Sequence, residues 1–306
     1  MELEKLTQAL NDSYTKELCY FKVRNSWKQE NKWLGMCAIT ALIVNDYYQG
    51  EICKIHVGEK AHYFNRVNDK IIDLTSYQFL NEINYTKYEI IPRKKVLDNL
   101  DTTERYLKLK VSVQRILLTQ VDKEVHQCYC CGELVEKFPI GPTIYIGKDN
   151  DIVLVGEAPA NNGWRKSHKL WKDIHGKVLP SGIILQKLFD TIERDVFHTT
   201  FLEAVKCYPV DRKNLKICSQ NCKKIMERQL DILQPKLIIA LGEFPTRKLL
   251  NVKFKKFKDV VGKIYEVNGL KILPIYHPSP ISPMSYKGNL PIFEKLKNEI
   301  QEFTSI

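Results

Sequence analysis

Three residues in the first quarter of the chain have the types and the order of a cysteine nucleophile site. Cys37 opens the apolar run of residues 38–44, which predicts a helix that begins at the cysteine. The dipole of such a helix lowers the pKa of the thiol at its start, because it stabilises the thiolate. His62 and Asp73 follow in two short segments that we interpret as strands. This order predicts a Cys-His-Asp site for acyl chemistry. A buried cysteine and a hydrogen-bonded histidine in a folding or interaction module are the alternative.

A second group of reactive side chains is a set of clustered cysteines. Six of the nine lie between positions 128 and 222: Cys128, Cys130, Cys131, Cys207, Cys218 and Cys222. The first ten residues include acids and no apolar signal core, which predicts a reducing compartment. There, clustered cysteines bind metal or do chemistry more often than they form disulfides. Four thiolates suit a [4Fe–4S] cluster or a tetrahedral zinc ion, and free cysteines without metal are the alternative.

The third candidate is a strand that ends in a tight turn. Residues 152–155 are apolar and rich in β-branched side chains, and Gly156 and Pro159 then turn the chain. In an open α/β sheet, ligands bind at the carboxyl ends of the strands. Gly156, Glu157, Ala158 and Pro159 are therefore expected at the rim of a pocket. An ordinary turn between a strand and a helix is the alternative.

The composition favours a polyanionic partner. The 306 residues include 47 Lys and Arg against 36 Asp and Glu, a formal net charge of +11. A basic excess favours nucleic acid through counterion release, although a generally basic surface without a specific partner is the alternative. No stretch approaches the ~20 apolar residues of a membrane helix. We therefore expect a polyanionic partner, no membrane partner and a cytoplasmic location.

These candidates fall into two predicted domains. The length allows two domains. Residues 94–122 are charged, contain neither Gly nor Pro, and carry a broken apolar stripe, which predicts a helical connection. We place a small α+β domain at residues 1–118 and an α/β domain at residues 119–306.

The second domain carries four motifs in the order of a known family. They are GEAPA at 156–160, EAVKCYPVDRKN at 203–214, PKLIIALG at 235–242 and HPSP at 277–280. These resemble GEAPG, NVVKCRPPGNR, P-x-x-I-x-x-LG and HPS of the uracil-DNA glycosylase superfamily, and most closely its iron–sulfur branch, family 4. The resemblance covers about residues 120–304. It implies a central parallel four-stranded sheet flanked by helices, and an enzyme that cleaves the N-glycosidic bond of a DNA base to leave an abasic site.

The resemblance also implies roles for single residues. His277 would donate a hydrogen bond to O2 of the flipped base, and backbone amides around Glu157 and Ala158 would supply a second donor. Ala158 occupies the position where the best-known uracil glycosylases have a water-placing aspartate. Glu157 is therefore the candidate carboxylate, and water held by the backbone is the alternative. Contacts with DNA are expected from Lys206, Arg212, Lys213, Pro278, Ser279 and Pro280.

The same resemblance implies a structural [4Fe–4S] cluster, with zinc as the alternative. The implied ligands are Cys128, Cys131, Cys207 and Cys222. Cys130 and Cys218 are alternates, and Cys218 could displace Cys222. Such a cluster would clamp the loop before the first strand to the segment after Cys207 without taking part in bond cleavage.

Two departures from the family bear on the base. Glu203 stands where the family has the Asn that reads O4 and N3–H of uracil. A carboxylate accepts hydrogen bonds but cannot donate one unless it is protonated, so an amino-bearing base competes with uracil as the expected substrate. The family's base-stacking Phe is also missing. Leu179 is the nearest match, and Trp164 or Trp171 could serve instead or belong to the core.

The first domain resembles the small bacterial YunG family, with the pattern W-x-G-Q-C-A-x-T-A-L, H-Y-x-N and D-L-T-x-x-Q-F. The matching residues are Trp33, Gly35, Cys37, Ala38, Thr40, Ala41, Leu42, His62, Tyr63, Asn65, Asp73, Leu74, Thr75, Gln78 and Phe79. Met36 replaces the usual Gln before the cysteine, which puts an oxyanion role of that side chain in doubt. The order is similar to that of papain-like and transglutaminase-like enzymes, but the family brings no secure activity with it.

Three functions therefore compete. The first is a DNA N-glycosylase, and the second is a non-catalytic nucleic-acid binder that senses a base in the same pocket. The third is a thiol hydrolase or acyl transferase formed by Cys37, His62 and Asp73 in the first domain.

Overall fold

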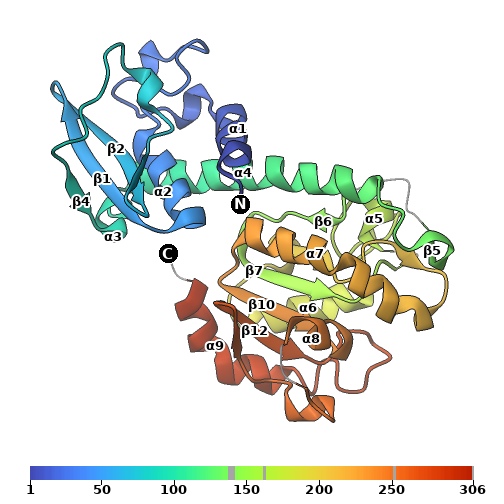
Figure 1. The fold of residues 1–306 in the computed structure, drawn as a ribbon. Helices are drawn as coiled ribbons and strands as arrows, with labels where there is room; N and C mark the ends of the chain where they lie inside the picture. Colours follow the sequence, from blue (N-terminus) through green and yellow to red (C-terminus); the bar gives the residue numbers. More distant parts are fainter. Residues whose placement is uncertain (137–141, 161–162, 251–252, 305–306) are drawn as a thin grey trace. The chain divides into compact units, whose positions relative to one another are not determined.

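The computed structural model describes residues 1–136, 142–160, 163–250 and 253–304. The chain divides into two compact units, Met1–Leu117 and Leu118–Ile306. Helix α4 (Leu100–His126) is continuous through the boundary between them, in the region where the sequence predicts a helical connection (Figure 1). Within the described ranges, no helix combines the length and the apolar character needed to cross a membrane.

The first unit packs helices against an antiparallel sheet. Its strands are β1 (Glu51–Val57), β2 (Lys60–Val67), β3 (Lys70–Ile72) and β4 (Glu89–Ile91), in the order β3-β2-β1-β4. Its helices are α1 (Leu3–Ser13), α2 (Cys37–Tyr48), α3 (Arg93–Leu97) and the first part of α4. Helix α2 is apolar along most of its length and packs against β2. It begins at Cys37, as the sequence predicts.

The second unit is built on a six-stranded sheet in the order β11-β12-β10-β7-β8-β6. The four inner strands, β12 (Leu270–Ile275), β10 (Leu237–Leu241), β7 (Asp149–Gly156) and β8 (Thr199–Glu203), are parallel. The edges are the short antiparallel strands β11 (Tyr265–Val267) and β6 (Ile144–Tyr145). A separate pair joins β5 (Val135–Glu136) to β9 (Tyr208–Pro209). The predicted parallel four-stranded sheet is confirmed, and the two edge strands extend it.

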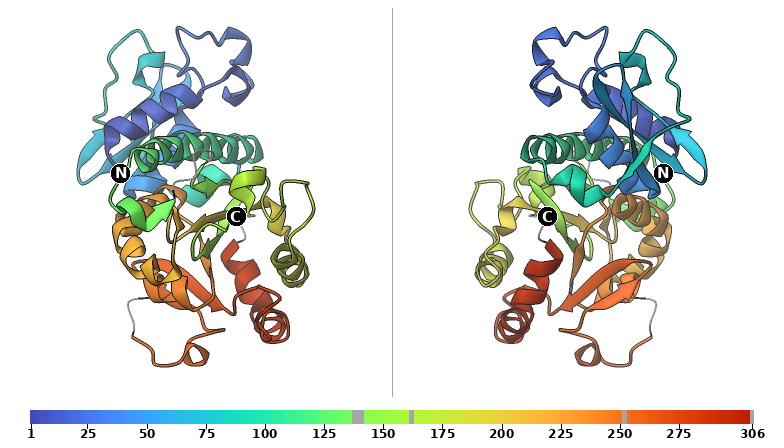
Figure 2. Two further views of the ribbon diagram at one scale, coloured as in Figure 1. Left: turned by 90° about the vertical axis from the view of Figure 1, so that its right-hand side faces the viewer. Right: turned by 90° about the vertical axis from the view of Figure 1, so that its left-hand side faces the viewer.

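Helices cover both faces of this sheet. They are α5 (Trp164–Ser167), α6 (Pro180–Asp190), α7 (Leu215–Leu233), α8 (Glu243–Leu249) and α9 (Leu290–Thr304). Figure 2 shows α7 on one side of the sheet and α6 and α9 on the other. Apolar side chains of β7, β10 and β12 alternate between the two faces, and one set forms a buried core with those of α6 and α9. Because both faces are buried, β10 is apolar at every position.

The topology determines where the sequence motifs meet. Strands β7, β8, β10 and β12 run in parallel, so their carboxyl ends lie at one edge of the sheet. The segments after Gly156, Glu203, Leu241 and Ile275 leave the sheet at that edge. In open parallel sheets this is the edge where ligands bind.

Candidate functional site

A wide cleft opens at the carboxyl ends of the parallel strands. Its volume is about 730 Å³, and its walls include Glu157, Arg212, Gly242, Phe244, His277 and Ser279. These residues follow β7, precede α7, begin α8 and follow β12. Charged and aromatic groups that converge on a large cleft at this edge make it the leading candidate for a ligand site.

The turn after β7 holds Glu157 at the cleft. The carbonyl oxygens of Gly156 and Glu157 each accept a backbone hydrogen bond of 2.9 Å from the two residues that follow β8. Gly156 lies close to the ring of Phe201, and a Cβ at position 156 would come within 2.9 Å of that ring. The carboxylate of Glu157 is half-buried and pairs with the guanidinium of Arg212. This wall of the cleft therefore carries a carboxylate that is paired with a cation.

His277 offers one ring nitrogen as a donor. The backbone N–H of Ser279 donates to Nδ1 at 3.1 Å, so the proton of the neutral ring lies on Nε2. Partial desolvation of the ring and the charge of Arg212 lower the pKa of His277. Gly242, at φ 98°, permits this placement, since a Cβ there would lie 3.2 Å from Cβ of His277. The ring is therefore neutral near pH 7 and carries an Nε2–H donor.

Glu203, which the motifs predict to read the base, is paired inside the protein. It is buried at the end of β8, where Oε1 accepts a hydrogen bond from Trp164 Nε1 at 3.0 Å. Oε2 accepts one from Arg165 Nη2 at 2.9 Å. Glu203 is not among the described residues that line the cleft, so its contact with a base stays a prediction. Sequence reasoning missed this role of Arg165, although a carboxylate in a buried strand signals the need for a cation.

The position of Lys206 corrects the sequence analysis. Its side chain is buried, and Nζ donates to the carbonyl of Glu203 at 2.5 Å. Arg165 donates to the carbonyl of Lys206 at 2.6 Å. Desolvation lowers the pKa of Lys206 to about 8, against the opposing charge of Glu203. The predicted contact of Lys206 with a DNA phosphate is therefore wrong, because its ammonium group is buried and bonded within the protein.

The other predicted DNA contacts lie at the surface. Arg212 and Lys213, in a 3₁₀ turn (Arg212–Asn214), have side chains that are 79% and 80% exposed. Beyond His277, Pro278 is buried, Ser279 is half-buried and Pro280 is exposed. Their contacts with DNA stay predictions.

A different aromatic ring lines the cleft from those that the sequence suggested. Leu179 precedes α6, donates its N–H to the carbonyl of Trp171 at 2.7 Å, and is not among the described cleft residues. Trp164 and Trp171 belong to the buried core. Phe244 is half-buried on α8 and shares the cleft with His277. The sequence feature that could have predicted Phe244 is its position, two residues after the glycine that follows a buried strand.

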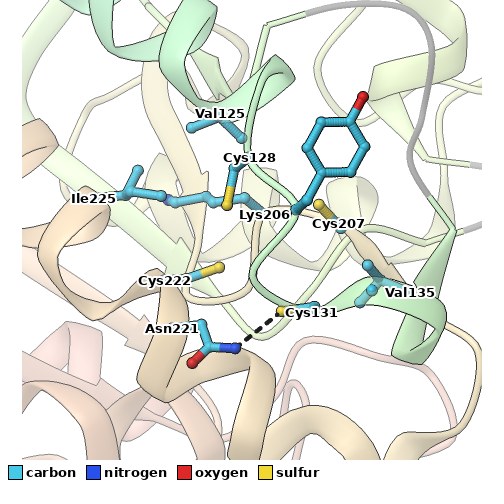
Figure 3. Close-up of a pocket in the computed structure, with 11 residues that line it drawn as sticks. Val125, Cys128, Cys131, Val135, Lys206, Cys207, Asn221, Cys222 and Ile225 are labelled. Atoms are coloured by element: carbon cyan, nitrogen blue, oxygen red, sulfur yellow. Dashed lines mark hydrogen bonds between the residues drawn. The ribbon is translucent and has the colours of Figure 1, made fainter.

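A second, smaller cavity gathers four cysteines (Figure 3). Cys128 and Cys131 come from the loop after α4, Cys207 lies between β8 and β9, and Cys222 is on α7. Asn221 Nδ2 donates to Cys131 Sγ at 3.4 Å. Among the described residues, the two alternate ligands, Cys130 and Cys218, do not line this cavity.

Of these alternates, Cys130 is exposed, whereas Cys218 lies in an apolar cluster with Val205 and Leu215 and beside Cys131. Neither lines the cavity that holds the four cysteines. The structure therefore brings together the four residues that the family resemblance implies. Their role as ligands remains a prediction.

Comparison with known proteins identifies the second unit. The family model for the uracil DNA glycosylase superfamily matches residues 144–301, more than half of the chain. The chain belongs to the uracil-DNA glycosylase superfamily. A type-4 uracil-DNA glycosylase of Archaeoglobus fulgidus is 28% identical over 177 residues, which are 54% of this chain and 82% of that protein. A type-4 enzyme of Saccharolobus solfataricus is 34% identical over 143 residues, 42% of this chain and 61% of that protein.

The first unit has its own relatives. The family model for YunG protein matches residues 2–118. The uncharacterized protein YunG of Bacillus subtilis is 35% identical over 92 residues, 30% of this chain and 77% of that protein. The N-terminal part therefore belongs to the YunG family, and the chain joins a YunG domain to a glycosylase-superfamily domain.

The donor chemistry of the glycosylase-superfamily domain fits a metal cluster. Burial raises the pKa of Cys207 to about 11, with a further contribution from the neighbouring Cys222. Thiols in this state become thiolates when a metal displaces their protons. Lys206 lines the same cavity, and its charge favours the thiolate of Cys222. Among the described residues, no group of three or more His, Cys, Asp or Glu side chains is already placed to hold a metal ion. The fit of a cluster to this site therefore rests on the four thiols that line the cavity.

The YunG domain holds its predicted residues together as well. His62 Nε2 lies 2.5 Å from Asp73 Oδ2, and both side chains are buried. Asp73 also accepts hydrogen bonds from the hydroxyl of Tyr85 and the backbone N–H of Thr75. Cys37, the first residue of α2, forms a hydrogen bond with His62. The predicted Cys-His-Asp set is therefore in contact.

Proposed function

We propose that the glycosylase-superfamily domain is a DNA N-glycosylase that cleaves the bond between a base and its sugar and leaves an abasic site. The observation that carries this proposal is the shared cleft of Glu157 and His277, in which Nδ1 of the histidine is occupied and Nε2–H is a donor. The type-4 names of two relatives support the same reaction class.

In this proposal the target base leaves the duplex and enters the cleft. As the bond to the sugar breaks, negative charge develops on the base and positive charge on the sugar. The Nε2–H of neutral His277 donates to the base oxygen and lowers the barrier, because the donor is already oriented. The carboxylate of Glu157 stabilises the positive sugar and orients the attacking water. Phe244 supplies an aromatic face against which the base stacks.

Charges at the rim of the cleft support DNA as the substrate. Exposed Arg212 and Lys213 lie close to the turn that carries Glu157, and a phosphate there would compete for the guanidinium of Arg212. Ser279 and Pro280 extend the rim beyond His277. Binding of a phosphate would free Glu157 for the sugar, so DNA contact and catalysis would be coupled at one ion pair.

Glu203 bears on which base is excised. Its carboxylate oxygens accept hydrogen bonds from Trp164 and Arg165, and each retains one lone pair. Toward a base it would accept hydrogen bonds and repel a carbonyl oxygen. An amino-bearing base such as cytosine or a modified cytosine therefore fits better than uracil, whose O4 would face this carboxylate.

The four cysteines Cys128, Cys131, Cys207 and Cys222 would hold a structural [4Fe–4S] cluster, with zinc as the alternative. The group would supply no chemistry to the bond cleavage. The cysteines would fix the loop after α4 to the segment after β8 and to α7, and so support the wall of the sheet edge from which Glu157 projects.

The test is base excision by full-length protein that is purified without oxygen. Oligonucleotides with uracil, hypoxanthine, cytosine, hydroxymethylcytosine or glucosylated cytosine are incubated as single strands and duplexes, and abasic sites are detected by alkaline cleavage. We expect product on at least one base, lost by about 10²–10³-fold in His277→Ala, which removes the donor. His198→Ala is the matched control, because this histidine is half-exposed on the surface of the same domain.

Two outcomes would contradict the proposal. Excision that is equal in His277→Ala and wild type would remove the histidine from the chemistry. The absence of product on every base, with DNA binding retained, would instead favour the base-sensing protein, which the pairing of Glu203 inside the domain also permits.

A further inference from the structure

The YunG domain contains a cluster of reactive groups that a glycosylase does not use. Cys37, His62 and Asp73 come from three elements: the start of α2, strand β2 and the turn just after β3. Helix α2 packs against β2, and this packing places the thiol beside the imidazole. All three residues belong to the first unit, Met1–Leu117.

Hydrogen bonds assign a separate role to each ring nitrogen of His62. Nε2 donates to the Asp73 carboxylate at 2.5 Å. Asp73 is fixed in turn by Tyr85 at 2.8 Å and by the backbone N–H of Thr75 at 3.0 Å. Nδ1 is then the nitrogen that faces the thiol of Cys37 and can take its proton. This is the arrangement of a base held in one tautomer by a carboxylate.

The energetics of the pair favour a charged imidazole. Burial disfavours the imidazolium, but the hydrogen bonds to Asp73 and Cys37 and their charges outweigh it and raise the pKa of His62 to about 9. Burial alone would raise the pKa of Asp73, yet its bonds to His62, Tyr85 and Thr75 lower it. His62 can therefore accept the proton of the Cys37 thiol, because the carboxylate of Asp73 compensates the positive charge that forms on the ring.

A side-chain amide beside His62 is the candidate donor for a developing oxyanion. Met36 occupies the position before the cysteine, is buried, and has no donor to offer. Gln78 instead approaches from a 3₁₀ turn (Ser76–Gln78), with Nε2 3.4 Å from His62 Nδ1. The same amide donates to the carbonyl of Thr75 at 3.0 Å, which orients it. The backbone N–H of Cys37 belongs to the first turn of α2, where N–H groups lack partners within the helix.

Aromatic side chains lie against His62 and on the segment that carries Gln78. Phe79 packs edge-on against His62, with ring centroids 4.9 Å apart. Trp33 and Tyr77 pack with centroids 5.2 Å apart, and Tyr77 is 73% exposed. Leu80, which follows Phe79 in the chain, is fully exposed. Apolar groups exposed next to a buried polar cluster favour a substrate whose acyl part is uncharged and apolar.

We propose that the YunG domain is a thiol acyl hydrolase: Cys37 is its nucleophile, His62 its base and Gln78 its side-chain oxyanion donor, and Asp73 positions His62. The substrate class is an uncharged amide or ester with an apolar acyl group. This activity is independent of base excision, and the cleft of the second domain takes no part in it.

The reaction is balanced as follows. The thiolate of Cys37 attacks the carbonyl carbon, and the oxyanion is stabilised by Gln78 and the backbone N–H of Cys37. The bond from carbon to the amine or alcohol breaks, and His62 gives its proton to the leaving group. A thioester remains on Cys37. Water then attacks this thioester, His62 takes a proton from the water and returns it to the sulfur, and the carboxylic acid leaves.

The test uses the full-length chain and two readouts. The first is the rate at which iodoacetamide alkylates single cysteines at pH 6, located by peptide mass spectrometry. The second is the burst of 4-nitrophenol from 4-nitrophenyl butyrate, with the acyl-protein detected by intact mass. An ordinary thiol has a pKa near 8.5 and reacts slowly at pH 6, so we expect Cys37 to react at least about tenfold faster than buried Cys53.

The variants separate catalysis from structure. Cys37→Ala abolishes the burst, and Asp73→Asn lowers both alkylation and burst, the burst by about 10²–10⁴-fold. Gln78→Ala lowers the burst by about 10²-fold but leaves alkylation unchanged, because alkylation forms no oxyanion. His56→Ala, an exposed histidine of the same domain, is the control for His62→Ala and changes neither readout.

The proposal is overturned if Cys37 in the folded wild-type chain is alkylated no faster than Cys53 at pH 6. A burst that survives Cys37→Ala overturns it too. If Gln78→Ala lowers alkylation and burst equally, Gln78 holds the fold of the site and is not the oxyanion donor.

Discussion

At the scale of single residues, the protonation of His277 is set by its neighbours. Nδ1 accepts from the backbone of Ser279, while partial desolvation and Arg212 oppose a positive charge on the ring. A buried or cation-flanked imidazole is neutral over a wider pH range than a free one, because its pKa falls. Glu157 lines the same cleft and pairs with Arg212.

This arrangement predicts the acid limb of base excision. Neutral His277 is the active form, so activity falls as the pH drops through its pKa in the folded protein, which lies below the ordinary value of ~6.5. Arg212→Gln removes a cation and unpairs Glu157, which raises that pKa and moves the acid limb to higher pH. The measurement is the single-turnover rate against pH. Lys213→Gln is the control, and an acid limb that does not move in Arg212→Gln contradicts the assignment.

The pair of Arg165 and Glu203 gives a second prediction at this scale. Both side chains are buried, so Arg165→Met leaves an uncompensated carboxylate and lowers the free energy of unfolding by about 3–5 kcal/mol. Arg165→Met combined with Glu203→Gln should recover most of that loss. Arg228→Met, at a surface pair, costs about 1 kcal/mol or less. Urea unfolding of the four proteins decides, and equal losses in the single and double variants would contradict the pairing argument.

At the scale of elements, the cysteine cavity joins three segments that lie far apart in sequence. The loop after α4, the segment between β8 and β9 and helix α7 each contribute a thiol to one space. Cys218 and Cys222 are one helical turn apart on α7 and both are buried, yet only Cys222 of the two lines the cavity. Their spacing places them on one face of α7. Cys222 faces the cavity, whereas Cys218, one turn earlier, packs in the apolar cluster with Val205 and Leu215.

This difference predicts which cysteine holds the cluster. Protein purified without oxygen is assayed for iron and for visible absorbance. Cys222→Ser should lose most of the iron, because three thiolates remain for a four-ligand group. Cys218→Ser should keep it and lose only packing. Loss of iron in Cys218→Ser and not in Cys222→Ser would exchange the two roles, and zinc in the wild type would replace the cluster with a tetrahedral ion.

At the scale of the whole molecule, the net charge of +11 is shared by two domains with different chemistry. Charge alone does not say which surface meets DNA. The proposed function places DNA at the cleft on the carboxyl edge of the parallel sheet, where Arg212 lies in the wall and Lys213 follows it in a surface turn.

The salt dependence of DNA binding tests this placement. Each phosphate contact that is lost lowers the slope of log affinity against log salt by about 1. We expect this change in Arg212→Gln and in Lys213→Gln, measured by fluorescence anisotropy on a duplex at several salt concentrations. Lys60→Gln, an exposed lysine of the YunG domain, should leave the slope unchanged. Equal slopes in all variants would place the DNA elsewhere.

The sequence by itself determined the two families, the parallel sheet and the start of α2 at Cys37. Local patterns carry this information, because strands, turns and glycines depend on neighbours in the chain. Tertiary structure alone decided that Lys206 is buried, that Glu203 pairs with Arg165 and that Phe244 lines the cleft. It also brought the amide of Gln78 to Nδ1 of His62, whereas Met36 has no donor to offer. These facts depend on which segments pack together and on which side chains lose their water, and neither is written in the spacing of residues along the chain.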